Sequence, residues 1–243
     1  MEKKIAILGD IHANIDALGS VLADAREQGA TDYVCVGDII GYNAAPRECI
    51  ETIRALPCQT VRGNHDHYCA YAETLEDFHP VAANVIEWTR RQLTEDHLQW
   101  LYDLPLTATV GGAFLMVHST LDMPERWGYV FDNLEAAAHL SYQMHVLCFH
   151  GHTHVPTVFE KELEVVRRPP ESLKLQLGKK YFINTGSVGQ PRDGDPRASY
   201  CLYQPKAREV TFRRVPYDVE AAQKKIHAAG LPDRLFHRLA QGR

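Results

Sequence analysis

The stretch that decides the fold is Lys4-Ile-Ala-Ile-Leu-Gly-Asp-Ile-His-Ala-Asn14. Its apolar run over residues 4–9 predicts a strand that is buried on both faces. Apolar residues at helical spacing follow over residues 15–25, so we expect a helix there. Asp10 and His12 lie in the short connection between the two. A buried strand that leads directly into a helix is typical of the first half of a strand–helix–strand unit.

The same alternation continues along the chain. We expect strands at 33–36 and 60–61 with a helix over 46–56 between them, which indicates a parallel sheet with helices packed on it. Residues 67–103 show helical spacing. The other expected elements are strands at 107–110, 114–117, 146–149, 157–159, 164–167, 181–184, 198–203 and 210–215, and helices over 132–142 and from 218.

These elements predict an α/β (α+β) fold in which two mixed β-sheets pack on each other and helices flank them, a four-layer αββα sandwich. No internal repeat, low-complexity tract or linker interrupts the pattern. We therefore expect a single domain over residues 1–243, with a helical insertion at about 67–104.

The composition of the 243-residue chain excludes several classes of protein. Its 45% hydrophobic and 23% charged residues are ordinary for a globular protein and exclude disordered, collagen-like and coiled-coil chains. The formal net charge of -5 argues against a standing basic surface, so we expect no stable binding to nucleic acid. No apolar run approaches the roughly 20 residues of a membrane helix, and the first one is too short for a signal peptide. We expect a cytoplasmic protein with no membrane contact.

The six cysteines are expected to be reduced core residues. None of them forms a Cys-x-x-Cys pair, and no export signal accompanies them. A phosphatase with a cysteine nucleophile needs an arginine six residues after the thiol, and no cysteine here has one. This excludes that class of phosphatase.

Polar motifs stand at the ends of five expected strands. They are Gly9-Asp10-Ile11-His12, Gly37-Asp38, Arg62-Gly63-Asn64-His65-Asp66, His118 and Gly151-His152-Thr153-His154. Ligands of open α/β sheets bind beyond the carboxyl ends of the strands. We therefore expect these five distant segments to converge on one site.

The residue types in these motifs suit one kind of ligand. Carboxylates, imidazoles and amide oxygens bind divalent first-row metals, and no cysteine joins them. Alternate residues of an extended chain point the same way, so both ends of an Asp-x-His or His-x-His motif can face one site. A carboxylate such as Asp38 can bridge two metals. Each motif alone also fits a turn or a buried histidine, but the combination predicts a metal site.

The five motifs resemble those of the calcineurin-like metallophosphoesterase superfamily: Asp-x-His, Gly-Asp, Gly-Asn-His-Asp/Glu, His and Gly-His-x-His. The runs Ile11–Leu18 and Asn184–Arg192 resemble its small bacterial and archaeal phosphoesterases, a group related to diadenosine tetraphosphatases and Ser/Thr phosphatases. Ala13 departs from that group, which usually has glycine there. The resemblance implies a metal-dependent hydrolase of phosphate esters with the superfamily fold over the whole chain.

The resemblance also implies two divalent metal ions. The ligands of one would be Asp10, His12 and His154, those of the other Asn64, His118 and His152, with Asp38 bridging both. Mixed donor sets of this kind accept manganese, iron, zinc, cobalt or nickel. We expect manganese or iron.

The chemistry implied by the resemblance is attack on phosphorus, in line with the leaving oxygen, by a hydroxide that bridges the metals. His65, oriented by Asp66, would be the general acid or transition-state stabiliser. Arg62 would contact phosphate, as an arginine at this place does in related protein phosphatases, although a surface ion pair is the alternative. Arg192 is a second expected phosphate contact, in a loop that either closes over the site or forms an ordinary turn.

Two segments are expected to choose the substrate. They are the insertion and residues 119–131, where Trp127, Tyr129 and Phe131 either stack a base or pack the segment onto the body. We expect a small phosphodiester or nucleotide substrate. A protein Ser/Thr phosphatase, a phosphomonoesterase and, from another class, a non-catalytic scaffold are the alternatives. A scaffold would have lost ligands, and none is missing. Whether the chain forms a homo-oligomer is left open.

Overall fold

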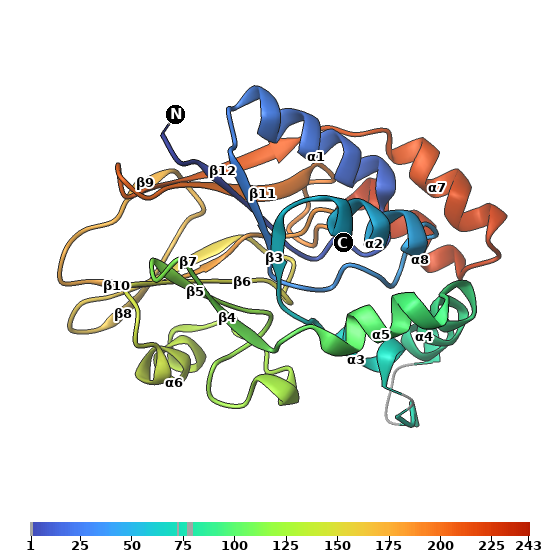
Figure 1. The fold of residues 1–243 in the computed structure, drawn as a ribbon, viewed down its shortest axis with the longest axis horizontal. Coiled ribbons are helices and arrows are strands. Elements are labelled where there is room, and N and C mark those ends of the chain that lie inside the picture. Colours follow the sequence, from blue (N-terminus) through green and yellow to red (C-terminus); the bar gives the residue numbers. More distant parts are fainter. Residues whose placement is uncertain (1, 72, 77–79) are drawn as a thin grey trace.

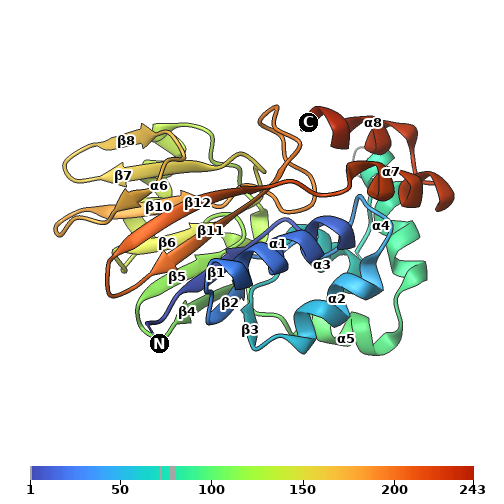
Figure 2. The ribbon, with the colours of Figure 1, turned by 90° about the horizontal axis from the view of Figure 1, so that it is seen from above.

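The computed structural model describes residues 2–71, 73–76 and 80–243. Two six-stranded sheets lie face to face, and helices cover their outer faces (Figure 1). Seen from above, the strands gather at one end of the molecule and most of the helices at the other (Figure 2).

The first sheet has the strand order β3–β2–β1–β11–β12–β9. Its strands are β1 (Ile5–Leu8), β2 (Asp32–Cys35), β3 (Cys58–Thr60), β9 (Leu173–Lys174), β11 (Ala198–Gln204) and β12 (Glu209–Val215). β1, β2 and β3 are parallel, and β11 pairs antiparallel with β1, with Ile7 opposite Cys201. The carboxyl ends of the three parallel strands therefore lie at one edge of the sheet.

The second sheet has the strand order β4–β5–β6–β10–β7–β8. Its strands are β4 (Thr107–Val110), β5 (Phe114–Val117), β6 (Leu147–His150), β7 (Thr157–Lys161), β8 (Val165–Arg168) and β10 (Lys180–Asn184). β5, β6 and β10 are parallel, while β4, β7 and β8 add antiparallel edges. The parallel strands bring the ends of β5 and β6 together.

The helices connect and flank these strands. They are α1 (Ile15–Glu27), α2 (Pro46–Ala55), α3 (Asn64–Ala70), α4 (Pro80–Gln92), α5 (Glu95–Asp103), the 3₁₀ helix η1 (Pro124–Arg126), α6 (Asn133–Tyr142), α7 (Val219–Ala228) and α8 (Asp233–Gln241). Side chains cap several of them: Asn14 accepts from the backbone N–H of Ala17 at the start of α1, and Asp132 from two N–H groups of α6.

Alternate residues of the strands face different layers. Ile5 and Ile7 of β1 point between the sheets, where they join a cluster with Phe149 of β6. Ala6 and Leu8 point the other way, toward the helices that cover the first sheet. Burying one large apolar side chain in this way contributes about 1.5–3 kcal/mol, which explains why β1 is apolar along its whole length.

The two outer layers are helical. Leu18 and Val21 of α1 pack on the outer face of the first sheet. Leu140 of α6 packs with Phe182 on the outer face of the second. The order helix, sheet, sheet, helix confirms the predicted αββα sandwich.

The C-terminal helices pack against the segment that connects β3 to β4. Val85 of α4 shares an apolar cluster with Ala222 and Ile226 of α7 and with Leu235 and Leu239 of α8. Figure 2 shows α7 and α8 beside α4. The end of the chain is thus held close to the loops that follow the parallel strands.

Most expected elements are present within a few residues. α3 begins at Asn64, ahead of the expected helical stretch, so the Asn64-His65-Asp66 motif forms its first turn. The short strand β9 and the helix α8 were not predicted. Residues 72 and 77–79 of the expected insertion lie outside the described residues. All six cysteines are free, as predicted, and only Cys58 is not fully buried.

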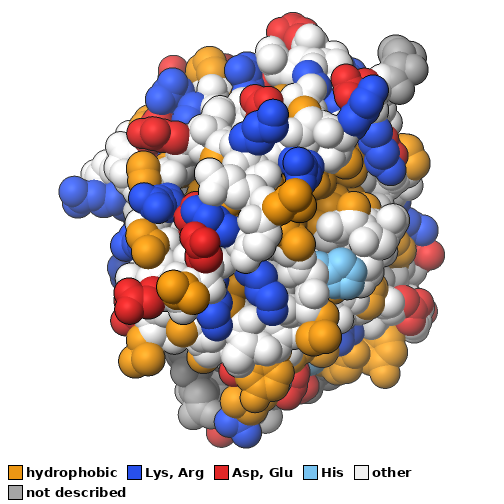
Figure 3. Space-filling view, turned by 90° about the vertical axis from the view of Figure 1, so that its left-hand side faces the viewer, with side chains coloured by type: hydrophobic (Ala, Val, Ile, Leu, Met, Phe, Trp, Pro, Cys, Tyr) orange, Lys and Arg blue, Asp and Glu red, His pale blue; other side chains and the backbone are white. Residues whose placement is uncertain are grey.

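The surface is mixed in charge. On the face drawn in Figure 3, Lys and Arg side chains are interspersed with Asp and Glu, and hydrophobic side chains occur in small groups between them. Among the described helices, none combines the length and the apolar character that a membrane crossing requires.

Candidate metal centre

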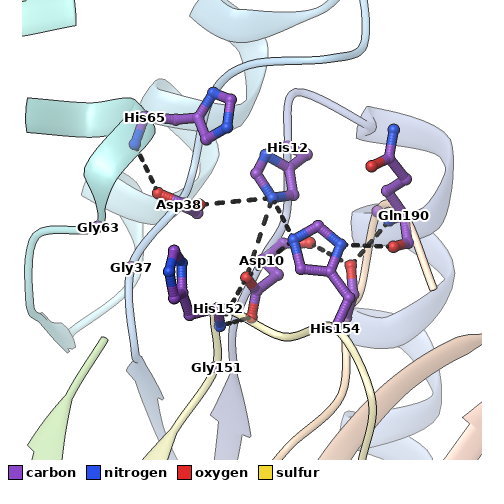
Figure 4. A network of polar contacts seen from close by, with 12 residues as sticks. Asp10, His12, Gly37, Asp38, Gly63, His65, Gly151, His152, His154 and Gln190 are labelled. Carbon is purple, nitrogen blue, oxygen red and sulfur yellow. Dashed lines mark hydrogen bonds and ion pairs between the residues drawn. The ribbon is translucent and has the colours of Figure 1, made fainter. Parts of the chain in front are cut away.

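The loops that follow five strands meet at one buried site. Asp10 and His12 follow β1, Asp38 follows β2, Asn64 opens α3 after β3, His118 follows β5, and His152 and His154 follow β6. All of these side chains except Asn64 belong to fully buried residues. In Figure 4 the side chains of Asp10, His12, Asp38 and His154 point toward one another. The expected convergence of the five segments is therefore seen.

The buried carboxylates and imidazoles form two groups that share one residue. The first group is Asp10, His12, Asp38 and His154, and the second is Asp38, His118 and His152. Within each group, one ligand atom of every residue lies within 4.8 Å of the others. The side-chain oxygen of Asn64 lies 3.1 Å from Nε2 of His118 and so adds an amide oxygen to the second group.

Each histidine of the two groups uses one ring nitrogen to contact a backbone carbonyl. The contacts are His12 Nδ1 with Ile40 (3.0 Å), His118 Nδ1 with Val36 (2.9 Å), His154 Nδ1 with Gln190 (2.6 Å) and His152 Nε2 with Trp127 (2.8 Å). A carbonyl oxygen only accepts, so these ring nitrogens carry the proton. The other ring nitrogen of each neutral imidazole then holds a lone pair that points into the site, as in metal-binding histidines.

The ring nitrogens that point into the site face each other at short range. Nε2 of His12 lies 3.0 Å from Nε2 of His154, and Nε2 of His118 lies 3.2 Å from Nδ1 of His152. Two lone pairs at this distance repel unless a proton or a cation lies with them. The donor set of imidazole, carboxylate and amide oxygen fits a divalent first-row metal in each group.

Burial keeps most of these imidazoles neutral. It lowers the pKa of His12 and of His154 well below their usual range and the pKa of His152 to about 3. Burial alone would also lower the pKa of His118, but the carboxylates of Asp38 and Asp10 raise it to about 9. Metals bind the neutral form of histidine, so three of the four imidazoles are already in the state that a metal requires.

The two buried carboxylates differ in the effect of the positive charge beside them. Burial raises the pKa of Asp10 to about 7, although its oxygens also accept from the backbone N–H of His152 at 3.0 and 3.1 Å. At Asp38, His118 and His65 outweigh burial and lower the pKa. An isolated buried carboxylate is costly, whereas one that coordinates a cation is stable.

The ligand-bearing loops have an unusual backbone. The values of φ are +50° at Asp10, +47° at His12, +54° at Asp38, +70° at His152 and +60° at His154. Residues other than glycine seldom adopt this left-handed conformation, and it costs about 1–3 kcal/mol at each position where the surroundings impose it. The rigid sheets thus hold these side chains in a conformation that an isolated loop would avoid.

His65 and Asp66 point in different directions, because consecutive helical residues are turned by about 100° from each other. The ring of His65 lies edge-on to that of His12, 4.9 Å between centroids, and its Nδ1 is buried without a hydrogen-bond partner among the described residues. Burial lowers the pKa of His65 to about 4, so it is neutral at pH 7.

The carboxylate of Asp66 has other partners than the expected His65 ring. One oxygen accepts from the backbone N–H of Asp38 (2.8 Å) and Gly63 (3.0 Å), and the other from Ile39 (2.9 Å) and Ile40 (3.4 Å). Asp66 therefore fixes the loop that carries Asp38. This corrects the expectation that Asp66 orients His65, because the carboxylate contacts backbone N–H groups instead of the His65 ring.

Arg62 is nearly buried, and its guanidinium contacts the segment between β3 and β4. It donates to the hydroxyl of Tyr71 and to the carbonyl of Tyr102, both at 2.7 Å, and lies over the ring of Tyr71. The alternative of a surface ion pair is not what the structure shows. These contacts hold Arg62 on the helical segment, with only Nε buried and unpartnered among the described residues.

Arg192 lies beside the first group. Its backbone N–H donates to the carbonyl of His154 (3.3 Å), and its guanidinium lies 5.5 Å from the ring centre of Tyr42. The ring of Tyr42 in turn lies 4.6 Å from that of His12 and 4.4 Å from that of His65. Sequence reasoning missed Tyr42, since a tyrosine one residue after a loop glycine carries no metal-site signal.

The expected aromatic segment borders the second group. The carbonyl of Trp127 accepts a hydrogen bond from Nε2 of His152. The ring of Tyr129 stacks on the His152 ring, with 4.0 Å between centroids. Trp127 itself is buried, whereas Tyr129 and Phe131 are about half exposed and stack on each other. Trp127 thus packs the segment onto the body, and the other two rings line the approach to His152.

The sequence matches the model of a known protein family. The model of the calcineurin-like phosphoesterase superfamily domain covers residues 3–208 of the chain. The chain belongs to the calcineurin-like phosphoesterase superfamily. This confirms the resemblance of the five motifs, and as a member of this superfamily the protein is a metal-dependent phosphoric ester hydrolase. α7 and α8 follow the matched residues.

Relatives of this superfamily member share the full length of the chain. An uncharacterised protein of Methanocaldococcus jannaschii is 38% identical over 246 residues, covering all of both chains. The crystal structure of a metallophosphoesterase from Sphaerobacter thermophilus is 41% identical, covers all of both chains and superimposes with a TM-score of 0.90. A hypothetical protein from Pyrococcus horikoshii shares the fold at 19% identity, with a TM-score of 0.80 over 99% of this chain and 98% of its own.

Proposed function

We propose that this protein binds two metal ions and hydrolyses phosphodiester or nucleotide substrates. The observation that carries the proposal is the orientation of the four imidazoles. Each gives one ring N–H to a backbone carbonyl, which leaves the other nitrogen directed into one of two groups that share Asp38. One cation alone would leave the donors of the other group without a partner.

The residues divide between two metal positions. The ligands of the first are Asp10, His12, Asp38 and His154, and those of the second are Asp38, Asn64, His118 and His152. When bound, the metals supply Lewis-acid chemistry: they lower the pKa of water and offset charge on the phosphoryl oxygens. Mixed nitrogen and oxygen donors without sulfur favour manganese or iron in this proposal, with zinc, cobalt and nickel as alternatives.

The remaining polar residues act on the substrate. His65, next to His12 and neutral, donates its ring N–H to the leaving oxygen and stabilises the charge that develops there. Arg192 contacts the phosphate, since it lies beside the first group and has no carboxylate partner among the described residues. Arg62 is engaged with Tyr71 and Tyr102, which leaves it the weaker candidate for this contact.

Metal analysis and a substrate panel test the proposal. Purified protein supplied with manganese or iron should bind about two ions per chain and hydrolyse bis(p-nitrophenyl) phosphate, and Asp38→Asn should lower both metal content and turnover. Asp103→Asn, at an exposed position of α5, is the matched control and should change neither. One ion per chain in the folded wild type would contradict the dinuclear proposal. Preference for a phosphopeptide would favour the protein phosphatase alternative.

A second variant tests the role of His65. His65→Ala should keep its metals and lose roughly 10²–10⁴-fold in kcat, the usual size of the effect of a positioned proton donor. His237→Ala, in the exposed part of α8, is the matched histidine control. Unchanged turnover in a metal-loaded His65→Ala protein would remove His65 from the mechanism.

A further inference from the structure

A cavity of about 160 Å³ lies next to the metal centre and is lined by three arginines. Its walls are formed by Tyr42, Val81, Ala82, Arg192, Arg234, Leu235 and Arg238. One ring separates it from the proposed metal site, because Tyr42 lines the cavity and also contacts the rings of His12 and His65. The cavity and the proposed metal site therefore share Tyr42 as a common wall.

The three arginines come from two segments, the loop of Arg192 and helix α8, which are joined by a backbone hydrogen bond. Arg234 and Arg238 are four residues apart and so lie on the same side of α8. The apolar side of α8 packs on α4 and α7 through Leu235 and Leu239. The N–H of Gly194, in the Arg192 loop, donates to the carbonyl of Gly242 just after α8 (2.9 Å).

In the part of the chain that the structure describes, no aspartate or glutamate side chain pairs with these three arginines. The two aspartates of the Arg192 loop are occupied elsewhere: Asp193 pairs with Arg214, and Asp195 with Arg197 (2.6 Å). Among the described residues, the guanidinium of Arg192 donates to the neutral side chain of Gln190 (3.1 Å), and that of Arg238 to the main-chain oxygen of Arg243 (2.6 Å).

Convergent like charges are unfavourable without a counter-charge. The three arginines line one cavity, and burial and the neighbouring Arg192 lower the pKa of Arg238. Guanidinium groups bind phosphate by paired, charge-assisted hydrogen bonds. An anion of this kind supplies the missing counter-charge.

We propose that Arg192, Arg234 and Arg238 bind a second phosphate group of the substrate while the first lies at the metals. The substrate is then an ester that carries two phosphate groups close together, such as a nucleoside diphosphate. The site rests on the proposed function. It adds a specificity element from α8, a helix that lies beyond the residues matched by the superfamily description.

ADP and AMP differ by the second phosphate and also by the leaving group, which is AMP from the anhydride and an alcohol from the monoester. The leaving-group effect is the same in wild type and variants, so the change in the ADP to AMP ratio between these proteins reports on the second phosphate. With metal-loaded, full-length protein, we expect kcat/KM for phosphate release to be at least tenfold higher for ADP than for AMP. The double variant Arg234→Gln/Arg238→Gln should lower this ratio at least tenfold. The control Arg26→Gln/Lys206→Gln changes charge by the same amount at exposed positions and should leave the ratio unchanged.

Calorimetric titration of the same proteins with α,β-methylene-ADP and AMP gives a readout that is independent of turnover. The double variant should weaken binding of α,β-methylene-ADP at least tenfold and change AMP binding less than threefold. An ADP to AMP ratio near one in the wild type, or one that the double variant leaves unchanged, would overturn the proposal. A change confined to inhibition by free orthophosphate would also overturn it, since the pocket would then hold a free anion.

The two proposals fail in different ways. If the wild type hydrolyses neither bis(p-nitrophenyl) phosphate nor either nucleotide with any metal, the proposed function fails, and the titration still reports on the arginine pocket. If the diester is hydrolysed but the arginine variants behave like their control, only the second-phosphate site fails.

Discussion

Replacing Asp66 by asparagine should destabilise the protein and loosen the metal centre together. Each oxygen of the Asp66 carboxylate accepts from two backbone N–H groups, those of Asp38 and Gly63 on one side and of Ile39 and Ile40 on the other. Asparagine has only one accepting oxygen, so two buried donors lose their acceptor whichever way the amide turns. At about 1–3 kcal/mol for each unsatisfied donor, we expect a loss of about 2–6 kcal/mol in the free energy of unfolding.

Urea denaturation of the wild type and Asp66→Asn measures this loss directly, and Asp103→Asn serves as the control for an exposed aspartate. Metal affinity is measured on the same samples and should fall, because the N–H groups that Asp66 holds belong to the loop of Asp38. Kinetics of Asp66→Asn, His65→Ala and the double variant then show whether Asp66 acts by fixing the Asp38 loop or by orienting the His65 ring. If Asp66 fixes the Asp38 loop, Asp66→Asn should lower kcat/KM further in the His65→Ala background.

Two results would refute this reasoning. One is an unfolding free energy within 0.5 kcal/mol of the wild type, which is the usual effect of a neutral surface change. The other is a double variant no slower than His65→Ala alone, which would mean that Asp66 acts through the His65 ring after all.

Three further outcomes follow from the site and the core. Gly151→Ala places a Cβ 2.1 Å from a carboxylate oxygen of Asp10, so metal content should drop at least tenfold, whereas Gly19→Ala, with nothing within 4 Å in α1, should raise the unfolding free energy by about 0.5–1 kcal/mol. Burial lowers the pKa of His139, which stacks on Phe182, to about 3. The unfolded chain therefore binds more protons than the folded one between pH 6.5 and 3. Stability accordingly falls as the pH is lowered through this range, by about 1.4 kcal/mol per pH unit from this group. His139→Leu should flatten the measured slope by that amount, and an unaltered slope would count against burial as the cause. Chelation should abolish hydrolysis and lower the melting temperature, with recovery on adding manganese or iron; activity that survives chelation, with metal analysis showing none bound, would contradict the metal requirement.

The sequence alone predicted the sheets and the convergence of their loops for a physical reason. The core strands are buried apolar runs, as in Ile5–Leu8, and the polar residues that follow them have no role in that core. Parallel pairing then brings distant strand ends together. The positions of Asp10, Asp38 and His118 therefore followed from strand order alone.

The directions of single side chains were harder to predict. Spacing places Asp66 next to His65, but the helix that begins at Asn64 turns their side chains apart. Arg62 could point to the phosphate or to the helical segment, and only the positions of Tyr71 and Tyr102 decide this. These choices depend on packing between segments far apart in sequence.

Helix α8 escaped prediction because its apolar side is narrow. The buried positions are Leu235 and Leu239, with Phe236 partly buried beside them, and most of the other residues of the helix are polar. A pair of leucines four residues apart is a weak signal unless a partner surface is known. That surface, formed by α4 and α7, exists only in the folded chain.

Because Asp38 belongs to both groups of donors, the two proposed cation positions are thermodynamically linked. The first ion to arrive would immobilise the common carboxylate, and the second would then meet a donor that has already lost its freedom. Such coupling acts in both directions, so releasing either ion weakens the hold on the other. Loading would accordingly be cooperative, and a shortage of metal would divide the population into full and empty molecules with few half-filled ones.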